Sequence, residues 1–146
     1  MSHRAVLPPT IALCGSRCFF GHMLELQKSL ARRGVASSLP LLYEEGDDPA
    51  QHARRWVERI RSPETRALLV VNLEKYGVPD YVGPHVLAEV GLATAEHKPV
   101  YLLGGIPAFC RDEFTAWGVT PLEGAVTTLI GEFTSRHLPS EAPCIS

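Results

Sequence analysis

The segment from Tyr81 to Leu103 constrains the fold of this chain more than any other part of its sequence. Gly83 and Pro84 are typical of a helix start, because proline at the first helical position loses no needed N–H group and has a preset φ. Apolar residues then recur at three- and four-residue steps, as on one buried face of a helix: Val86, Val90 and Ala93. Residues 100–103 follow as a short apolar run. We therefore expect a helix here, followed by a buried strand.

Glu89 lies inside this apolar helix, and it is the main candidate for chemistry. A carboxylate surrounded by apolar side chains must be paired with a cation, protonated or used in a reaction. At the ligand-binding edge of a sheet, it could act as a nucleophile or as a general base. The alternative is a glutamate that points outward from an amphipathic helix or bridges to an arginine.

The composition is that of an ordinary globular chain, and it argues against several classes of function. The 146 residues fit one domain, which we expect to span residues 1–138, with a flexible tail at 139–146. A net charge of −2, with 45% hydrophobic and 21% charged residues, argues against nucleic-acid or membrane-surface binding. No apolar run approaches the ~18 residues needed to cross a bilayer. Two prolines interrupt the segment where a secretory signal would lie, so we expect a cytoplasmic protein.

The four cysteines do not follow a metal-binding pattern. None of them forms a C-x-x-C pair, and the histidines are scattered, so we expect neither a metal site nor a cofactor. Reduced structural thiols are the simplest interpretation. Cys14 in particular is expected to be a small buried side chain at the end of a strand.

Apolar runs alternate with helical patterns along the chain. The expected strands are residues 10–14, 35–42, 67–72, 100–103 and 119–120, and the expected helices cover about residues 19–33, 49–61, 84–97, 112–117 and 126–133. Continuous apolar strands between helices indicate a parallel sheet covered on both faces. We therefore predict an α/β, Rossmann-like (flavodoxin-like) fold with a parallel sheet of about five strands.

Polar groups follow these strands at the edge where parallel sheets bind ligands. Gly15, Ser16 and Arg17 follow the first strand. Backbone N–H groups at a helix start, a hydroxyl and a forked cation together suit a phosphate, although a plain tight turn explains the same residues. Asn72 follows the third strand, and the helix that starts after Gly83 reaches the same edge.

Three more side chains are candidates for this edge. His85 precedes Glu89 by four residues, so both lie on one helix face, where the imidazole could contact a phosphate or assist a leaving group. It could equally face solvent. Tyr81 and Asn72 carry uncharged donors that could orient a sugar or a base, although Asn72 could instead cap a loop.

Four segments of the chain follow one another in a recognisable order: Ile11–Ser16, Leu68–Asn72, Tyr81–Ala93 and Lys98–Tyr101. Together they resemble the nucleoside 2-deoxyribosyltransferase-like superfamily, which includes the transferases and the deoxynucleoside 5′-monophosphate N-glycosidases. The similarity covers about residues 10 to 104. It implies a nucleoside or nucleotide substrate and a homodimer or higher homo-oligomer whose sites are completed across a subunit interface.

The resemblance also implies a role for each matching residue. Glu89 would attack the anomeric carbon and form a covalent glycosyl ester, which water or a second base then resolves. Residues 15–17 would hold the 5′ end of the substrate. Asn72, Tyr81 and His85 would position the sugar and the base, and Tyr81 or His85 would assist departure of the base.

The sequence departs from the family pattern at two positions. Gly83 stands where the transferases carry an aspartate and the N-glycosidases tend to carry a serine. Asn72 stands where an aspartate commonly ends the third strand of the transferases, and an amide cannot exchange a proton as an acid. Tyr81 and His85 are the available substitutes.

Two functions from different classes follow from these observations. The first is an N-glycosidase or glycosyltransferase that cleaves the N-glycosidic bond of a nucleoside or nucleoside 5′-monophosphate through Glu89. The second is a non-catalytic nucleotide-binding (sensor) domain on the same fold, in which Glu89 only hydrogen-bonds the ribose hydroxyls. A purely structural subunit is a third and weaker alternative.

Overall fold

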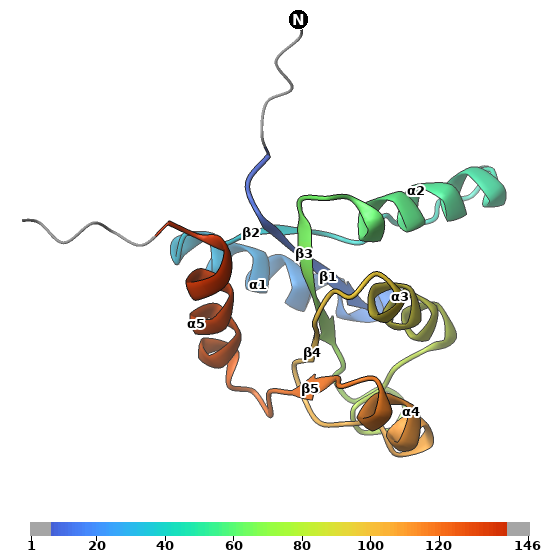
Figure 1. The fold of residues 1–146 in the computed structure, drawn as a ribbon. Coiled ribbons are helices and arrows are strands. Elements are labelled where there is room, and N and C mark those ends of the chain that lie inside the picture. Colours follow the sequence, from blue (N-terminus) through green and yellow to red (C-terminus); the bar gives the residue numbers. More distant parts are fainter. Residues whose placement is uncertain (1–6, 140–146) are drawn as a thin grey trace, which may run out of the picture.

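A single parallel sheet organises the computed structural model, which describes residues 7–139 (Figure 1). Its strands are β1 (Thr10–Gly15), β2 (Ala36–Ser38), β3 (Thr65–Val71), β4 (Val100–Leu102) and β5 (Thr120–Pro121). They lie in the order β2-β1-β3-β4-β5, and every neighbouring pair is parallel. The predicted Rossmann-like (flavodoxin-like) α/β fold is therefore confirmed.

Helices connect the strands as the alternation of patterns predicts. They are η1 (Arg17–Phe19), α1 (Phe20–Arg32), α2 (Pro49–Arg61), α3 (Pro84–Ala95), η2 (Ala108–Cys110), α4 (Arg111–Ala116) and α5 (Val126–His137), where η marks a 3-10 helix. The Asp48 side chain caps α2 by accepting a hydrogen bond from the Ala50 N–H at 3.1 Å. Gly83 is the N-cap of α3, and Pro84 is its first residue.

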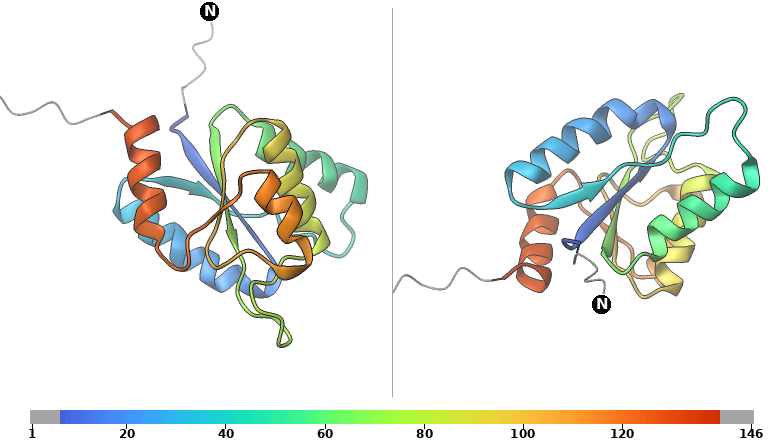
Figure 2. Two further views of the ribbon diagram at one scale, coloured as in Figure 1. Left: turned by 60° about the horizontal axis from the view of Figure 1, so that its bottom comes forward. Right: turned by 90° about the horizontal axis from the view of Figure 1, so that it is seen from above.

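The sheet is buried on both faces because successive strand residues point to opposite sides. One face packs against α2, α3 and α4, and the other packs against α1 and α5 (Figure 2). In β3, Leu68 and Val70 belong to the first cluster, whereas Leu69 and Val71 belong to the second. This two-sided burial explains why the strand is a continuous apolar run rather than an alternating one.

The second strand is shorter than the sequence analysis predicts. We expected it to cover residues 35–42, but β2 is only Ala36–Ser38. Pro40 has no N–H group to donate to a ladder, so the chain leaves the sheet after the strand. The following residues run over the carboxyl end of the sheet, where residues 40–43 line a cavity.

Two expectations concern the ends of the chain and the membrane. Apart from Pro139, the tail expected at residues 139–146 lies outside the described residues. Within residues 7–139, no helix combines the length and the apolar character needed to cross a bilayer.

Tyr101 predicts a pH dependence of stability on the face opposite α3. Its hydroxyl donates a hydrogen bond to the Glu132 carboxylate of α5, and burial together with this acceptor raises the pKa of Tyr101 to about 12. An unfolded tyrosine ionises near pH ~10, so between these values the unfolded state releases a proton that the folded state keeps. Stability therefore falls as pH rises through this range.

The matched comparison is Tyr101→Phe, which removes the titrating group. Urea unfolding at a series of alkaline pH values should show a steeper loss of stability for the wild type than for the variant. Parallel curves for the two proteins would contradict the assignment.

Candidate active site

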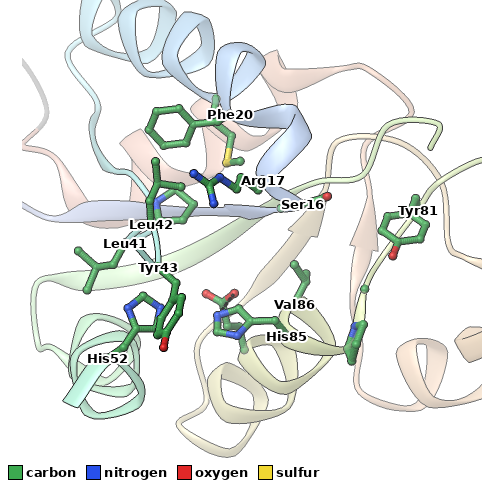
Figure 3. A pocket seen from close by; sticks show the side chains of 16 residues that line it. Ser16, Arg17, Phe20, Leu41, Leu42, Tyr43, His52, Tyr81, His85 and Val86 are labelled. Carbon is green, nitrogen blue, oxygen red and sulfur yellow. Dashed lines mark ion pairs between the residues drawn. The ribbon is translucent and has the colours of Figure 1, made fainter. Parts of the chain in front are cut away.

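A cavity of about 390 Å³ opens at the carboxyl end of the sheet, above β1 (Figure 3). It lies between the turn after β1, the segment after β2 and the first turns of α3. This is where the strand order of such a sheet reverses and where ligands bind. Its lining residues are Gly15, Ser16, Arg17, Phe20, Met23, Pro40, Leu41, Leu42, Tyr43, His52, Tyr81, Gly83, Pro84, His85, Val86 and Glu89.

Among residues 7–139, Glu89 is the one acidic side chain that lines this cavity. It lies on α3 with only 3% of its side chain exposed. Its Oε2 accepts a hydrogen bond from Cys14 Sγ at 3.2 Å and lies 3.6 Å from Arg59 Nη1. Its Oε1 lies 3.3 Å from His85 Nε2. The two carboxylate oxygens thus have different partners, which are Cys14 and Arg59 at Oε2 and His85 at Oε1.

The electrostatics of Glu89 reflect a balance between burial and these partners. Burial raises the pKa of the Glu89 carboxyl, and the Cys14 hydrogen bond, His85 and Arg59 each oppose that increase. Burial and the neighbouring carboxylate also raise the pKa of the Cys14 thiol well above its ordinary value. Cys14 therefore stays protonated and can donate its S–H to Glu89.

His85 lies on the cavity side of Glu89, four residues earlier on the same helix face, as the spacing predicts. Its side chain is 55% exposed. The ring also makes an edge contact with Trp56 of α2, with 5.1 Å between ring centroids. The imidazole is therefore largely exposed, as one of the two alternatives expected, and it also contacts the Glu89 carboxylate. Its contact with a phosphate or a leaving group stays a prediction.

A basic corner lies at the turn after β1. Arg17 lines the cavity, and Lys75 Nζ donates a hydrogen bond to Ser16 Oγ at 2.9 Å. Lys75 also lies 4.8 Å from the centroid of the Tyr81 ring. Neither Arg17 nor Lys75 takes part in an ion pair within residues 7–139. Among the described residues, two cations that have no ion-pair partner therefore lie at the turn after β1, and of these Lys75 contacts the Ser16 hydroxyl.

Two glycines shape the cavity wall by leaving space for neighbours. A Cβ at Gly15 would lie 2.9 Å from the Val71 carbonyl oxygen, so a side chain there would push β1 away from β3. A Cβ at Gly83 would lie 3.4 Å from the Tyr81 hydroxyl oxygen. The phenol of Tyr81 thus reaches the space next to the α3 start.

Asn72 differs from the other candidate residues, because it does not line this cavity. Its side chain is buried at the end of β3, where Nδ2 donates to the Gly105 carbonyl and Oδ1 accepts from the Gly104 N–H, both at 2.8 Å. Asp80 accepts from the Gly105 N–H at 2.9 Å. In this arrangement Asn72 fastens the loop after β4, which agrees with the loop-capping alternative.

Several residues of this site had no expected role in it, although Cys14 was expected to be buried at the end of a strand, as it is. Arg59 and Cys14 contact Glu89, and Lys75 contacts Ser16. Tyr43 and His52 contribute aromatic rings to the outer wall, with their centroids 5.2 Å apart. Helical spacing could have revealed Arg59, because it shares a face with two apolar residues of α2, Trp56 and Ile60.

Metal-binding side chains do not gather in the described part of the chain. Among residues 7–139, no group of three or more histidine, cysteine, aspartate or glutamate side chains could hold a metal ion.

The fold and the cavity define a parallel α/β protein with a cavity at the carboxyl edge of its sheet. Among solved structures, the chain is similar to a 2-desoxiribosyltransferase from Leishmania mexicana, with a TM-score of 0.52 and 15% sequence identity. The match covers 65% of this chain and 63% of that chain. At this identity the likeness concerns the fold alone. No protein-family model matches the sequence, and no curated protein does.

Proposed function

We propose that the chain is an N-glycosidase or glycosyltransferase that cleaves the N-glycosidic bond of a nucleoside or nucleoside 5′-monophosphate. The observation that carries this proposal is Glu89, a buried carboxylate that opens onto the cavity at the ligand-binding edge of the sheet. The likeness to a 2-desoxiribosyltransferase supports it as far as a shared fold can. Such a carboxylate is the group that divides glycoside cleavage into two displacements.

In the first displacement, a lone pair of the Glu89 carboxylate forms a bond to the anomeric carbon while the bond from that carbon to the base breaks. The base leaves with the bonding electron pair and takes up a proton, for which Tyr81 and His85 of the cavity lining are the candidates. In the second displacement, water or another base attacks the anomeric carbon and releases Glu89. Attack by water gives hydrolysis, and attack by another base gives transfer.

The remaining lining residues suggest how a substrate would lie. Arg17, Ser16 and the nearby Lys75 form a corner suited to the 5′ end, and to a phosphate in particular. We propose that the Tyr81 hydroxyl takes the place of the acid or serine that relatives carry at position 83. Its closeness to the space above Gly83 supports this substitution.

One observation favours a second candidate function, which is nucleotide binding without turnover. Within the described part of the chain, Glu89 is the one carboxylate in the cavity lining, and the Asn72 amide is bound to backbone groups outside it. The lining that the structure describes therefore offers no second carboxyl group to protonate the departing base. A sensor would use the same cavity, with Glu89 binding the ribose hydroxyls. The homo-oligomer implied by the family resemblance stays a prediction.

Release of free base separates these two functions. Ribo- and 2′-deoxyribonucleosides and their 5′-monophosphates are incubated with the protein, and the liberated base is measured by chromatography. We expect base release from at least one compound, and the preferred compound identifies the base and the sugar. Thermal stabilisation by a nucleotide without any base release would favour the sensor instead.

A further inference from the structure

Two side chains contact the Glu89 carboxylate on the side away from the cavity. Cys14 donates its S–H to Oε2, Arg59 lies 3.6 Å from the same oxygen, and neither residue lines the cavity. We propose that Cys14 and Arg59 are positioning residues that anchor Oε2 of Glu89, so that Oε1 is the oxygen that attacks the anomeric carbon. This inference rests on the glycosidic function proposed above.

The guanidinium of Arg59 is itself fixed by hydrogen bonds to two strands of the sheet. Its Nη2 donates to the carbonyl oxygens of Leu13 in β1 and Ser38 in β2, the latter at 2.8 Å, and its Nε donates to Ser38 Oγ at 3.1 Å. Only 9% of the Arg59 side chain is exposed. Because the planar guanidinium is held at Nε and at Nη2, Nη1 has a defined position opposite Glu89.

The other carboxylate oxygen is in a different situation. Among the described residues, the polar partner of Oε1 is His85, whose side chain lines the cavity and is more than half exposed. An exposed imidazole can turn into open space, whereas Cys14 and the Arg59 guanidinium are enclosed by packed strands. A substrate can therefore displace the partner of Oε1 but not the partners of Oε2.

The charges around Glu89 predict the direction of a pH effect. The groups that face it are Cys14 from β1, Arg59 from α2 and His85 from its own helix. Each of them lowers the pKa of the Glu89 carboxyl against the effect of burial. Loss of one of them should raise that pKa. The nucleophile would then be protonated at a higher pH, and the acid limb of the kcat/KM profile would move upward.

The main test uses Cys14→Ala and Cys14→Ser, since both replacements are small enough for a buried strand. Cys14→Ala removes the donor. We therefore expect the acid limb of the kcat/KM profile to shift toward higher pH by about half a pH unit to one pH unit. Cys14→Ser keeps a donor, so its limb should lie at or below that of the wild type. Cys110→Ala is the matched control, because it removes a buried cysteine of the same core cluster that has no contact with Glu89.

Arg59→Lys provides a second readout that a merely structural role would not produce. The lysine keeps the charge but not the fork that contacts the ends of β1 and β2. We expect kcat to fall by about 10- to 100-fold while KM changes little, because the carboxylate loses its orientation rather than the substrate its binding groups. Circular dichroism and the melting temperature report whether each variant is folded.

A direct titration of Glu89 separates this inference from the glycosidic function. Carboxyl-¹³C-labelled protein gives a Glu89 resonance, which Glu89→Gln assigns by its loss. In Cys14→Ala that resonance should titrate at a higher pH than in the wild type. Base release by the wild type, with unchanged titration and unchanged kcat in both variants, would overturn the positioning role alone. A shifted titration without any base release would retain the anchoring of Oε2 and overturn the attack by Oε1 together with the catalytic proposal.

Discussion

Glu89→Gln is expected to reduce the release of free base by at least about 10³-fold, because it removes the nucleophile and leaves only the binding groups of the cavity. Glutamine has nearly the same shape as glutamate, so the side chain can still occupy the space between Cys14, Arg59 and His85. The measurement is the initial rate of base release from the preferred substrate, at saturating and at limiting concentration.

Glutamine is a better choice than alanine for this test. Both replacements remove the charge opposite the buried Arg59 guanidinium, but alanine also removes every acceptor and leaves a void there, whereas the glutamine amide oxygen can still face Nη1. Removing one partner of a buried ion pair costs about 3–5 kcal/mol of stability, and alanine offers nothing to offset that cost. A lost activity could then be explained by unfolding. Thermal unfolding of the glutamine variant, with and without nucleotide, shows whether the cavity still forms and binds.

Glu96→Gln is the matched control for the same chemical change. Glu96 is the C-cap of α3, pairs with Arg61 near the surface and lies outside the cavity. An exposed ion pair contributes little to stability, so this variant should retain the wild-type rate. Equal rates for wild type and Glu89→Gln would exclude Glu89 as the nucleophile. A covalent sugar adduct on the peptide that contains Glu89, found by mass spectrometry, would identify the attacked residue directly.

The fold was predictable from the sequence because its strands are buried on both faces. Residues 67–71 form an unbroken apolar run for this reason, and Gly83-Pro84 and Asp48-Pro49 mark two helix starts by local chemistry alone. The second strand was the exception. Hydrophobicity continues beyond Ser38, but Pro40 cannot extend the ladder, and the apolar residues that follow line the cavity instead.

Candidate site residues were recognised from the sequence only where a residue lies next to a strand end or inside an atypical helix face. Glu89 stood out because it is a charge within an apolar helix. Arg59 did not, because α2 carries several arginines and most of them face solvent, as Arg54, Arg55 and Arg61 do. Contacts such as the one between Lys75 and Ser16 join residues far apart in the sequence, so no local pattern could have predicted them.

The basic corner predicts that the protein distinguishes a nucleoside 5′-monophosphate from the corresponding nucleoside. Arg17→Ala and Lys75→Ala should each lower kcat/KM for the monophosphate by about 10- to 100-fold, since each removes a charge-assisted contact to the phosphate. The nucleoside should be affected far less. Both cations lack an ion-pair partner within residues 7–139, so a phosphate would not have to displace a carboxylate from either of them.

The comparison is made with both substrates on every variant and at two salt concentrations. Lys28→Ala is the control, because Lys28 is an exposed cation of α1 that pairs with Glu25 outside the cavity. Added salt should weaken the preference of the wild type for the monophosphate, as screening reduces the attraction between the corner and the dianion. If Arg17→Ala and Lys75→Ala lowered kcat/KM equally for nucleoside and monophosphate, the corner would serve the sugar or the fold rather than a phosphate. If the preference for the monophosphate over the nucleoside disappears only in Arg17→Ala and Lys75→Ala, the turn after β1 binds the 5′ phosphate of the substrate.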